Sequence, residues 1–269
     1  MTTNNQAQIF HALHDDGLLI LPNAWDAGSA RIVEHAGAKA IATSSAAVAW
    51  AHGYPDGEAI PSEILITTVR EIARVVSVPV TADIEAGYTK DSLAAAEFAA
   101  RIVDAGAVGV NIEDGLDAPE LLCAKIEQVR KAAVKSGVDL WINARIDVYL
   151  HNLAEGQAAF DETVRRARLY SAAGANSIFA PGAVDETTIG NLVREVGRPL
   201  NILAWPGLPD AARLRALGVR RLSAGAGLAK ASLGHTHQLT EVFLRDGSSE
   251  PFFDKAFASL KLNDMMRRD

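Results

Sequence analysis

Residues 78–114, VPVTADIEAGYTKDSLAAAEFAARIVDAGAVGVNIED, carry the pattern from which the fold can be inferred. Two short and almost continuously apolar runs, 78–84 and 108–112, flank an Ala-rich run, 91–105, that is typical of a helix. Apolar runs without alternation indicate strands covered on both faces, as in a parallel sheet with helices outside. Gly106 stands where the helix should end. The stretch therefore predicts a strand, a helix and a second, parallel strand.

The same alternation runs through the whole chain. The predicted strands are GLLILPNA (17–24), AKAIATSS (38–45), VPVTADI (78–84), VGVNIED (108–114), LWINARID (140–147), NSIFAPG (176–182), LNILAW (200–205) and RRLSAG (220–225). Because eight such units favour closure, we predict the α/β class and a (β/α)8 TIM-type barrel. No linker divides the sequence, so residues 1–269 are interpreted as one domain, in which residues 246–269 or so form a C-terminal helical extension.

That extension carries an apolar stripe of Phe252, Phe253, Phe257 and Leu260. Two interpretations stay open. The stripe packs either on its own barrel or on a neighbouring subunit. The second interpretation predicts a homo-oligomer, a dimer or a tetramer.

Composition excludes several functional classes. The 269 residues are 49% hydrophobic and 22% charged, which fits a globular chain with a large core. A net charge of −7 without a basic stripe argues against nucleic acid as a partner. No apolar run is long enough for a membrane span, and the N-terminus lacks a signal-peptide pattern. With a single cysteine, these features predict a cytoplasmic protein.

Polar residues gather where the predicted strands end, which is where barrel enzymes place their chemistry. Asp83 and Glu85 are two residues apart, hence on one side of an extended strand. The same spacing relates Asn111 to Glu113. The complete set is Asn23, Asp26, Ser44, Ser45, Asp83, Glu85, Asn111, Glu113, Asp114, Asn143, Arg145, Asp147 and Asn201.

Converging carboxylates repel one another unless a cation compensates them. Oxygen ligands without a His or Cys set favour Mg²⁺, with Mn²⁺ as the alternative, so Asp83, Glu85 and Glu113 are the candidate metal ligands. The competing interpretation is that helix amides or Arg145 satisfy these acids. Arg145 itself suits a substrate carboxylate or an internal salt bridge with Asp147 or Glu113, and both uses are expected.

Small residues follow the second predicted strand. The backbone amides of Ser44, Ser45 and Ala46 are candidates for binding a substrate carboxylate, although such a stretch is more often only a tight turn. Cys123 is interpreted as an inert residue of a helix that begins at Pro119. His235 and His237, for which no matching acids are found, are interpreted as surface or interface residues.

Five segments together resemble the isocitrate lyase/phosphoenolpyruvate mutase superfamily. They are LPNAWDAGSARIVEHAGAKAI (21–41), TSSAAVAWAHGYPDGE (43–58), VPVTADIEAGY (78–88), DAGAVGVNIEDG (104–115) and INARIDVYL (142–150). The resemblance implies a Mg²⁺-dependent barrel that binds 2-oxo or 2-hydroxy carboxylates and breaks or forms C–C or P–C bonds. It also implies a tetramer in which neighbours exchange the last helix.

Transferred by position, the resemblance implies that Asp83 holds the metal and that Glu85, Glu113 and Asp56 hold its water shell. Ser44, Ser45 and Ala46 would line the carboxylate pocket. Arg145 would bind the substrate. Asn201, Glu113 and Asp56 complete the candidate substrate-binding and catalytic residues.

The chain departs from the superfamily in two places. Glu85 stands where Asp is common. The Lys-Lys/Arg-Cys-Gly-His loop of isocitrate and methylisocitrate lyases is absent, because the sequence IEDGLDAPELLCAKIEQVRKAA (112–133) passes almost directly into a helix.

The leading hypothesis is a Mg²⁺-dependent lyase that cleaves a C–C bond in a small 2-hydroxy- or 2-oxo-dicarboxylate through a metal-stabilised enolate. Two alternatives stay open. One is a P–C bond enzyme of the phosphonopyruvate hydrolase or phosphoenolpyruvate mutase type. The other is a non-catalytic binder of 2-oxo acids.

Overall fold

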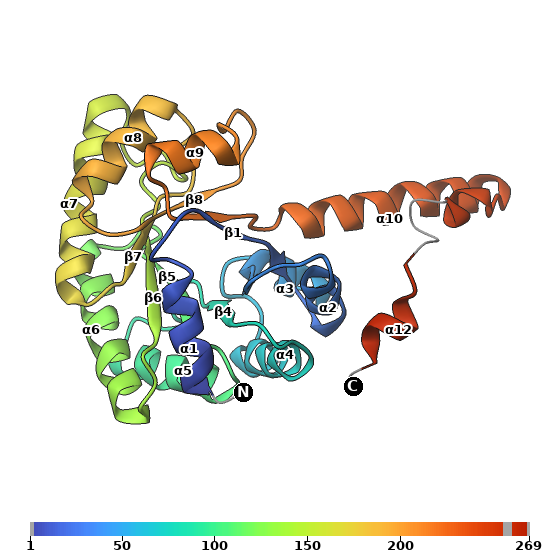
Figure 1. The fold of residues 1–269 in the computed structure, drawn as a ribbon, viewed down its shortest axis with the longest axis horizontal. Coiled ribbons are helices and arrows are strands. Elements are labelled where there is room, and N and C mark those ends of the chain that lie inside the picture. The colour runs from blue at the N-terminus through green and yellow to red at the C-terminus, as the bar shows by residue number, and fades with distance from the viewer. Residues whose placement is uncertain (1–2, 255–259, 268–269) are drawn as a thin grey trace.

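The computed structural model describes residues 3–254 and 260–267. Its core is one sheet of nine parallel strands in the order β1-β9-β8-β7-β6-β5-β4-β3-β2, wrapped by helices as a nearly closed (β/α)8-type barrel (Figure 1). The strands are β1 (Leu19–Leu21), β2 (Asn23–Ala24), β3 (Ile41–Thr43), β4 (Val80–Asp83), β5 (Gly109–Glu113), β6 (Trp141–Arg145), β7 (Ser177–Phe179), β8 (Leu200–Leu203) and β9 (Arg221–Ser223). The predicted fold class is confirmed.

The ninth strand comes from the first predicted one, which Pro22 divides into β1 and β2. Proline has no backbone N–H to donate to a ladder, so the segment changes partner at this residue. β1 pairs with β9, whereas β2 pairs with β3. One extended segment thereby joins the first and last units of the barrel.

Helices follow the strands. They are α1 (Thr3–Ala12), α2 (Ala27–His35), α3 (Ser45–Ala51), α4 (Ser62–Val75), α5 (Ser92–Asp104), α6 (Pro119–Ser136), α7 (Gly156–Ala173), α8 (Glu186–Glu195), α9 (Ala211–Leu217), α10 (Gly227–Asp246), a 3-10 turn (Glu250–Phe253) and α12 (Leu262–Met266). Aspartates cap several of these helices. Asp91, for example, accepts hydrogen bonds from the amides of Leu93 and Ala94 at the start of α5.

Aromatic residues close the amino end of the barrel. The imidazole of His14 stacks on Trp141 with ring centroids 3.9 Å apart, and Phe10 meets both rings edge-on. Gly109, at the start of β5, makes room for this plug, because a Cβ there would lie 2.9 Å from Phe10 Cε1 and 2.8 Å from Thr81 Oγ1. These side chains fill the amino end of the barrel interior.

The C-terminal helices leave the barrel. α10 projects away from it as a long arm (Figure 1), and Ala229 is the only buried residue that the arm contains. α12 returns to α2, where Arg31 Nε donates to the carbonyl of Met265 at 2.9 Å. Of the predicted stripe, Phe252 and Phe253 are exposed, and Phe257 lies outside the described residues. Within those residues, no helix combines the length and apolarity that crossing a membrane requires.

Candidate active site

A cavity of about 530 Å³ opens at the carboxyl ends of the strands. Its wall contains most of the residues that were predicted to bind a substrate or metal. They are Ser44, Ser45, Ala46, Asp56, Asp83, Asn111 and Arg145. Segments far apart in sequence thus meet at one place, which is what a barrel achieves by aligning its strand ends.

Asp83 is the last residue of β4 and is almost fully buried at the cavity wall. Its two carboxylate oxygens accept only long hydrogen bonds from backbone amides, 3.2 Å from Ser45 and 3.4 Å from Glu85. The backbone of Asp83 is held by a shorter hydrogen bond, in which its amide donates to Thr43 Oγ1 at 2.8 Å. The carboxylate is therefore well positioned, yet no side-chain cation among the described residues forms an ion pair with it.

Glu85 does not share a strand face with Asp83, contrary to the prediction from spacing. β4 ends at Asp83, and Glu85 takes a left-handed backbone conformation with φ of 49°. Its carboxylate instead receives the Glu58 amide at 2.6 Å and the Tyr88 hydroxyl at 3.1 Å. Burial, with the nearby charge of Asp83, raises the pKa of Glu85 to about 7. The alternation rule failed here because β4 ends two residues before Glu85.

Arg145, at the end of β6, is held between two acids. Its Nη1 lies 2.6 Å from a carboxylate oxygen of Glu113, and its Nε donates to Asp147 at 2.6 Å. Both acids raise the pKa of Arg145 against the opposing effect of burial. Burial raises the pKa of Glu113, and the positive charge of Arg145 offsets this rise only in part. The internal salt bridge is thus formed, while Arg145 still lines the cavity.

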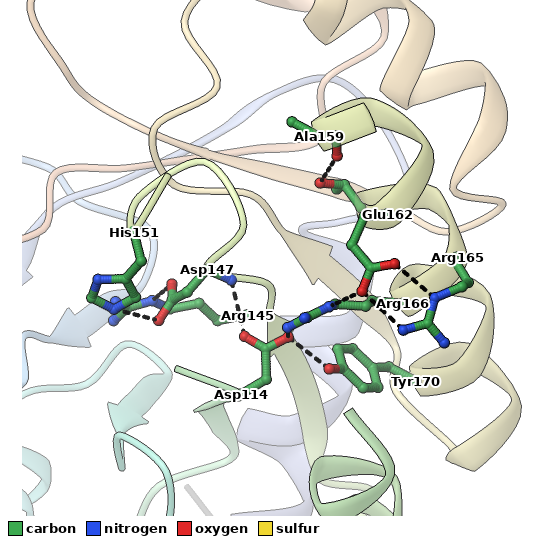
Figure 2. A network of polar contacts seen from close by, with 10 residues as sticks. Asp114, Arg145, Asp147, His151, Ala159, Glu162, Arg165, Arg166 and Tyr170 are labelled. Atoms are coloured by element: carbon green, nitrogen blue, oxygen red, sulfur yellow. Dashed lines mark hydrogen bonds and ion pairs between the residues drawn. The ribbon is translucent and has the colours of Figure 1, made fainter. Parts of the chain in front are cut away.

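Sequence reasoning missed the network that supports Arg145 (Figure 2). Asp114, one residue beyond β5, accepts hydrogen bonds from the Asp147 amide at 3.0 Å, Arg166 Nη1 at 2.8 Å and the Tyr170 hydroxyl at 2.6 Å. Asp114 and Asp147 are fully or almost fully buried, and Arg166 and Tyr170 both belong to α7. The network therefore ties the loop after β6, which orients Arg145, to a helix outside the barrel.

Three predicted residues lie behind the cavity rather than on its wall. Glu85 and Glu113 are not among the lining residues. Asn201, predicted to bind substrate, is fully buried and accepts a hydrogen bond from Ser223 at 3.1 Å, so Ser223 stands between it and the cavity. The assignment of Asn201 as a direct substrate contact is corrected on this ground.

The segment after β3 is a short helix rather than a tight turn. Ser44 caps α3, accepting from the amide of Ala47 at 3.5 Å, and the helix carries Trp50 to the cavity wall. Trp205 and Lys230 also line the cavity. The ammonium of Lys230 lies 5.7 Å from the centroid of the Trp50 ring, within range of a cation–π interaction.

The donor set fits a hard divalent cation that keeps part of its water shell. Within residues 3–254 and 260–267, no three His, Cys, Asp or Glu side chains are arranged to hold a metal on their own. Mg²⁺ needs no such cage, because it is often bound through one or two carboxylates and water. The weakly compensated charge of Asp83 and the raised pKa values of Glu85 and Glu113 reflect a concentration of carboxylates whose charge a divalent cation would balance.

Cys123 lies on the first turns of α6, which begins at Pro119 as predicted, and burial raises the pKa of its thiol. A thiol with a raised pKa is a poor nucleophile, in agreement with the interpretation of Cys123 as inert. His237 is exposed on α10, 3.5 Å from Glu241.

The fold and this cavity define a class: (β/α)8 barrels whose strand ends present carboxylates and an arginine at one cavity. The chain belongs to the phosphoenolpyruvate phosphomutase family, whose family model matches residues 10–244. Its structural relatives lie in the phosphoenolpyruvate mutase/isocitrate lyase superfamily, which confirms the resemblance inferred from the sequence.

Individual relatives show the range of activities. An uncharacterised protein of Mycobacterium tuberculosis is 36% identical over 222 residues, 81% of each chain. The 2-methylisocitrate lyase of Aeropyrum pernix is 26% identical over 262 residues, 93% of this chain and 83% of the relative. The crystal structure of a phosphonopyruvate hydrolase with oxalate and Mg²⁺ is similar with a TM-score of 0.84 at 25% identity, covering 97% of this chain and 94% of the other.

Proposed function

We propose that the protein is a Mg²⁺-dependent lyase that cleaves a C–C bond in a small 2-hydroxy- or 2-oxo-dicarboxylate. The observation that carries the proposal is the pairing of Asp83 with Arg145 on one cavity wall. Among the residues that the structure describes, no cationic side chain forms an ion pair with Asp83, and Arg145 is oriented by the carboxylates of Glu113 and Asp147. Relatives named 2-methylisocitrate lyase support this reaction type.

In this proposal Asp83 binds Mg²⁺, and Glu85, Glu113 and Asp56 hold the water shell of the ion. The bound ion would supply a Lewis acid that polarises the substrate carbonyl or hydroxyl. Arg145 uses Nη1 and Nε on Glu113 and Asp147 and also lines the cavity, and in this proposal its Nη2 donates to the substrate. The hydroxyls of Ser44 and Ser45 and the amide of Ala46 would receive the substrate carboxylate.

Proton transfer is assigned to Glu113. Burial raises the pKa of its carboxyl, which favours the protonated form and fits a group that gives up and takes back a proton. Tyr88 is a poorer candidate for a base, because burial and the neighbouring Glu85 raise the pKa of its phenol further above neutrality. Glu113 acts beside Arg145, the residue that would contact the substrate.

The test is an NMR time course, with ¹H and ³¹P detection, of oxaloacetate, substituted malates, isocitrate and phosphonopyruvate with the purified protein. We expect a 2-oxo acid to appear only with Mg²⁺ and intact Asp83. An Asp83→Ala protein controls for spontaneous decarboxylation of oxaloacetate. Mg²⁺-dependent stabilisation by oxalate without turnover of any compound would contradict the lyase and identify a binding protein.

Phosphate release from phosphonopyruvate would instead support the second candidate, a P–C bond enzyme. The similarity to phosphonopyruvate hydrolase favours including it. The connection between β5 and α6 argues against it, because residues 114–118 alone join these elements and contain no arginine or lysine. A short acidic connection is ill-suited to covering a phosphonate.

We also propose that the protein works as a homo-oligomer. A groove of about 710 Å³ lies beside β1 and is lined by Leu19, Ile20, Ile32 and Leu228 among others. α10, which leaves its own barrel, exposes Leu233 and Phe243. The α10 of a second copy would cover this groove. Light scattering should show a dimer or tetramer, and Leu233→Glu with Phe243→Glu should reduce it to monomers.

A further inference from the structure

The cavity wall divides into two chemically different halves. The strand ends from β2 to β6 contribute polar residues, among them Ser45, Asp83, Asn111 and Arg145, and Asp56, Ser223 and Lys230 add to them from other segments. The last residues of β7 and β8 and the loops after β6, β7 and β8 contribute an apolar surface. It consists of Leu150, Phe179, Pro181, Leu203, Trp205 and Pro206, and is called the apolar wall below.

From this division we infer that the substrate carries an apolar arm next to the reacting 2-oxo or 2-hydroxy group, and that the apolar wall receives it. The inference rests on the proposed function, which places the carboxylate head between Asp83 and Arg145. It narrows the substrate class from dicarboxylates in general to acids with an alkyl or aryl branch.

Charge supports this assignment. The charged residues that line the cavity are Asp56, Asp83, Arg145 and Lys230, and none belongs to the apolar wall. The second cationic residue of the lining, Lys230 of α10, lies over the ring of Trp50 of α3. A carboxylate placed against the apolar wall would lose its hydration without gaining a partner, which is costly.

Size and packing point the same way. At about 530 Å³ the cavity is well within the range of pockets that hold drug-sized ligands, and a carboxylate head alone would leave most of it empty. Leu203 is fixed in the wall because Gly225 leaves room for it. A Cβ at residue 225 would lie 2.7 Å from Leu203 Cδ1. Phe179 is nearly fully buried at the end of β7. The wall is therefore a preformed surface.

The experiment measures dissociation constants by calorimetry, with Mg²⁺, for oxalate, pyruvate, 2-oxobutanoate, 2-oxopentanoate and 2-oxohexanoate. Each added methylene should tighten binding by roughly 2- to 4-fold, the effect of burying that group. Among the five-carbon acids, 2-oxopentanoate should bind at least about 10-fold more tightly than 2-oxoglutarate, whose arm ends in a second carboxylate.

A matched pair of variants locates the effect. Leu203→Asn, which keeps the shape and adds polarity, should flatten the chain-length series and leave oxalate binding unchanged. Leu203→Met should preserve the series, because it conserves volume and apolarity. Trp205→Ala, at an exposed side chain of the apolar wall, should weaken only the longer acids.

The outcomes separate the two proposals. If oxalate binds but affinity does not rise with chain length, or if 2-oxoglutarate binds more tightly than 2-oxopentanoate, the inference of an apolar arm is wrong. The proposed function would then still stand. Failure of oxalate to bind in the presence of Mg²⁺ would overturn the proposed head site, and the arm with it.

Discussion

Asp83 and Asp114 are two buried aspartates at the ends of neighbouring strands, β4 and β5, and they differ in their partners. Asp114 accepts from Arg166, from the Tyr170 hydroxyl and from the Asp147 amide, all within 3.0 Å. Asp83 accepts only backbone amides, at 3.2 and 3.4 Å. Among the described residues, Asp114 therefore has side-chain as well as backbone donors, whereas Asp83 has backbone donors alone.

The difference in hydrogen-bond partners distinguishes an aspartate that stabilises the fold from one that serves ligand binding. A carboxylate with a full set of protein partners stabilises the fold, since a buried charge must be compensated. A carboxylate held in place without a cation, beside acids whose pKa values are raised, is prepared for a ligand. Substitution of Asp83 should therefore impair ligand binding, whereas substitution of Asp114 should lower the stability of the fold.

The largest effect is expected from Asp83→Asn. The carboxylate charge is lost while the side-chain oxygen of Asn can still accept one of the two long backbone hydrogen bonds, so Mg²⁺-dependent oxalate binding and turnover should fall by on the order of 10³-fold or more. The melting temperature should hardly change. Asp117→Asn, at a more exposed acid that pairs with Lys90, is the matched control and should retain activity. A strongly lowered melting temperature for Asp83→Asn would contradict the comparison.

Asp114→Asn should act mainly on stability. It leaves the buried guanidinium of Arg166 with Glu162 as its remaining acid, and we expect the free energy of unfolding to fall by about 3 kcal/mol. Tyr170→Phe should cost about 1 kcal/mol, the usual contribution of a single hydrogen bond. Urea denaturation measures both. If Asp114→Asn lost activity at full stability, the network would belong to the active site instead.

Arg145→Lys tests the residue that links the cavity with the Asp114 network, because Arg145 lines the cavity and binds Asp147, whose amide donates to Asp114. A lysine cannot contact Glu113, Asp147 and a substrate at once through one planar group, so kcat/KM should fall by about 100-fold. Arg165→Lys, at a half-exposed arginine paired with Glu162 in the same network, is the control and should leave kcat/KM unchanged (Figure 2). An unaltered kcat/KM in Arg145→Lys would remove the arginine from the proposed substrate contact.

Much of this arrangement was predictable from sequence, because it depends on periodicity. Unbroken apolar strands and regular glycines predicted the barrel, and strand-end positions predicted that Ser44, Asp83 and Arg145 meet at one cavity. Period-two alternation also held a signal for Asp114. One residue past Glu113, it should face away from the barrel axis, toward α7.

Other features depend on local geometry that alternation cannot supply. Glu85 lies beyond the end of its strand in a left-handed conformation, so spacing misplaced its side chain. Asn201 sits beneath Ser223, a depth within the barrel that sequence does not indicate. Arg166 and Tyr170 come from a helix whose rotation relative to the sheet is set by packing, and no spacing in the chain relates them to Asp114.

The smallest predicted effect concerns His14, a buried group at the closed end of the barrel. Burial and Arg221 lower its pKa from 6.5 to about 3, and its Nδ1 donates to the Phe10 carbonyl at 2.8 Å in the neutral form. Between these pKa values the unfolded chain binds a proton that the folded protein does not. Stability from neutral His14 is thus present above pH 6.5 and falls as the pH drops toward 3.

From pH 7 to 5.5 this loss should be about 1 kcal/mol. Glu85 acts in the opposite direction, because its pKa is raised to about 7 and the folded protein takes up the proton first. The two contributions are separated by comparing the unfolding free energy of the wild type with that of His14→Gln over this range. The variant should lose less stability on acidification. Equal pH slopes for the two proteins would show that folding does not lower the pKa of His14, and would contradict the prediction.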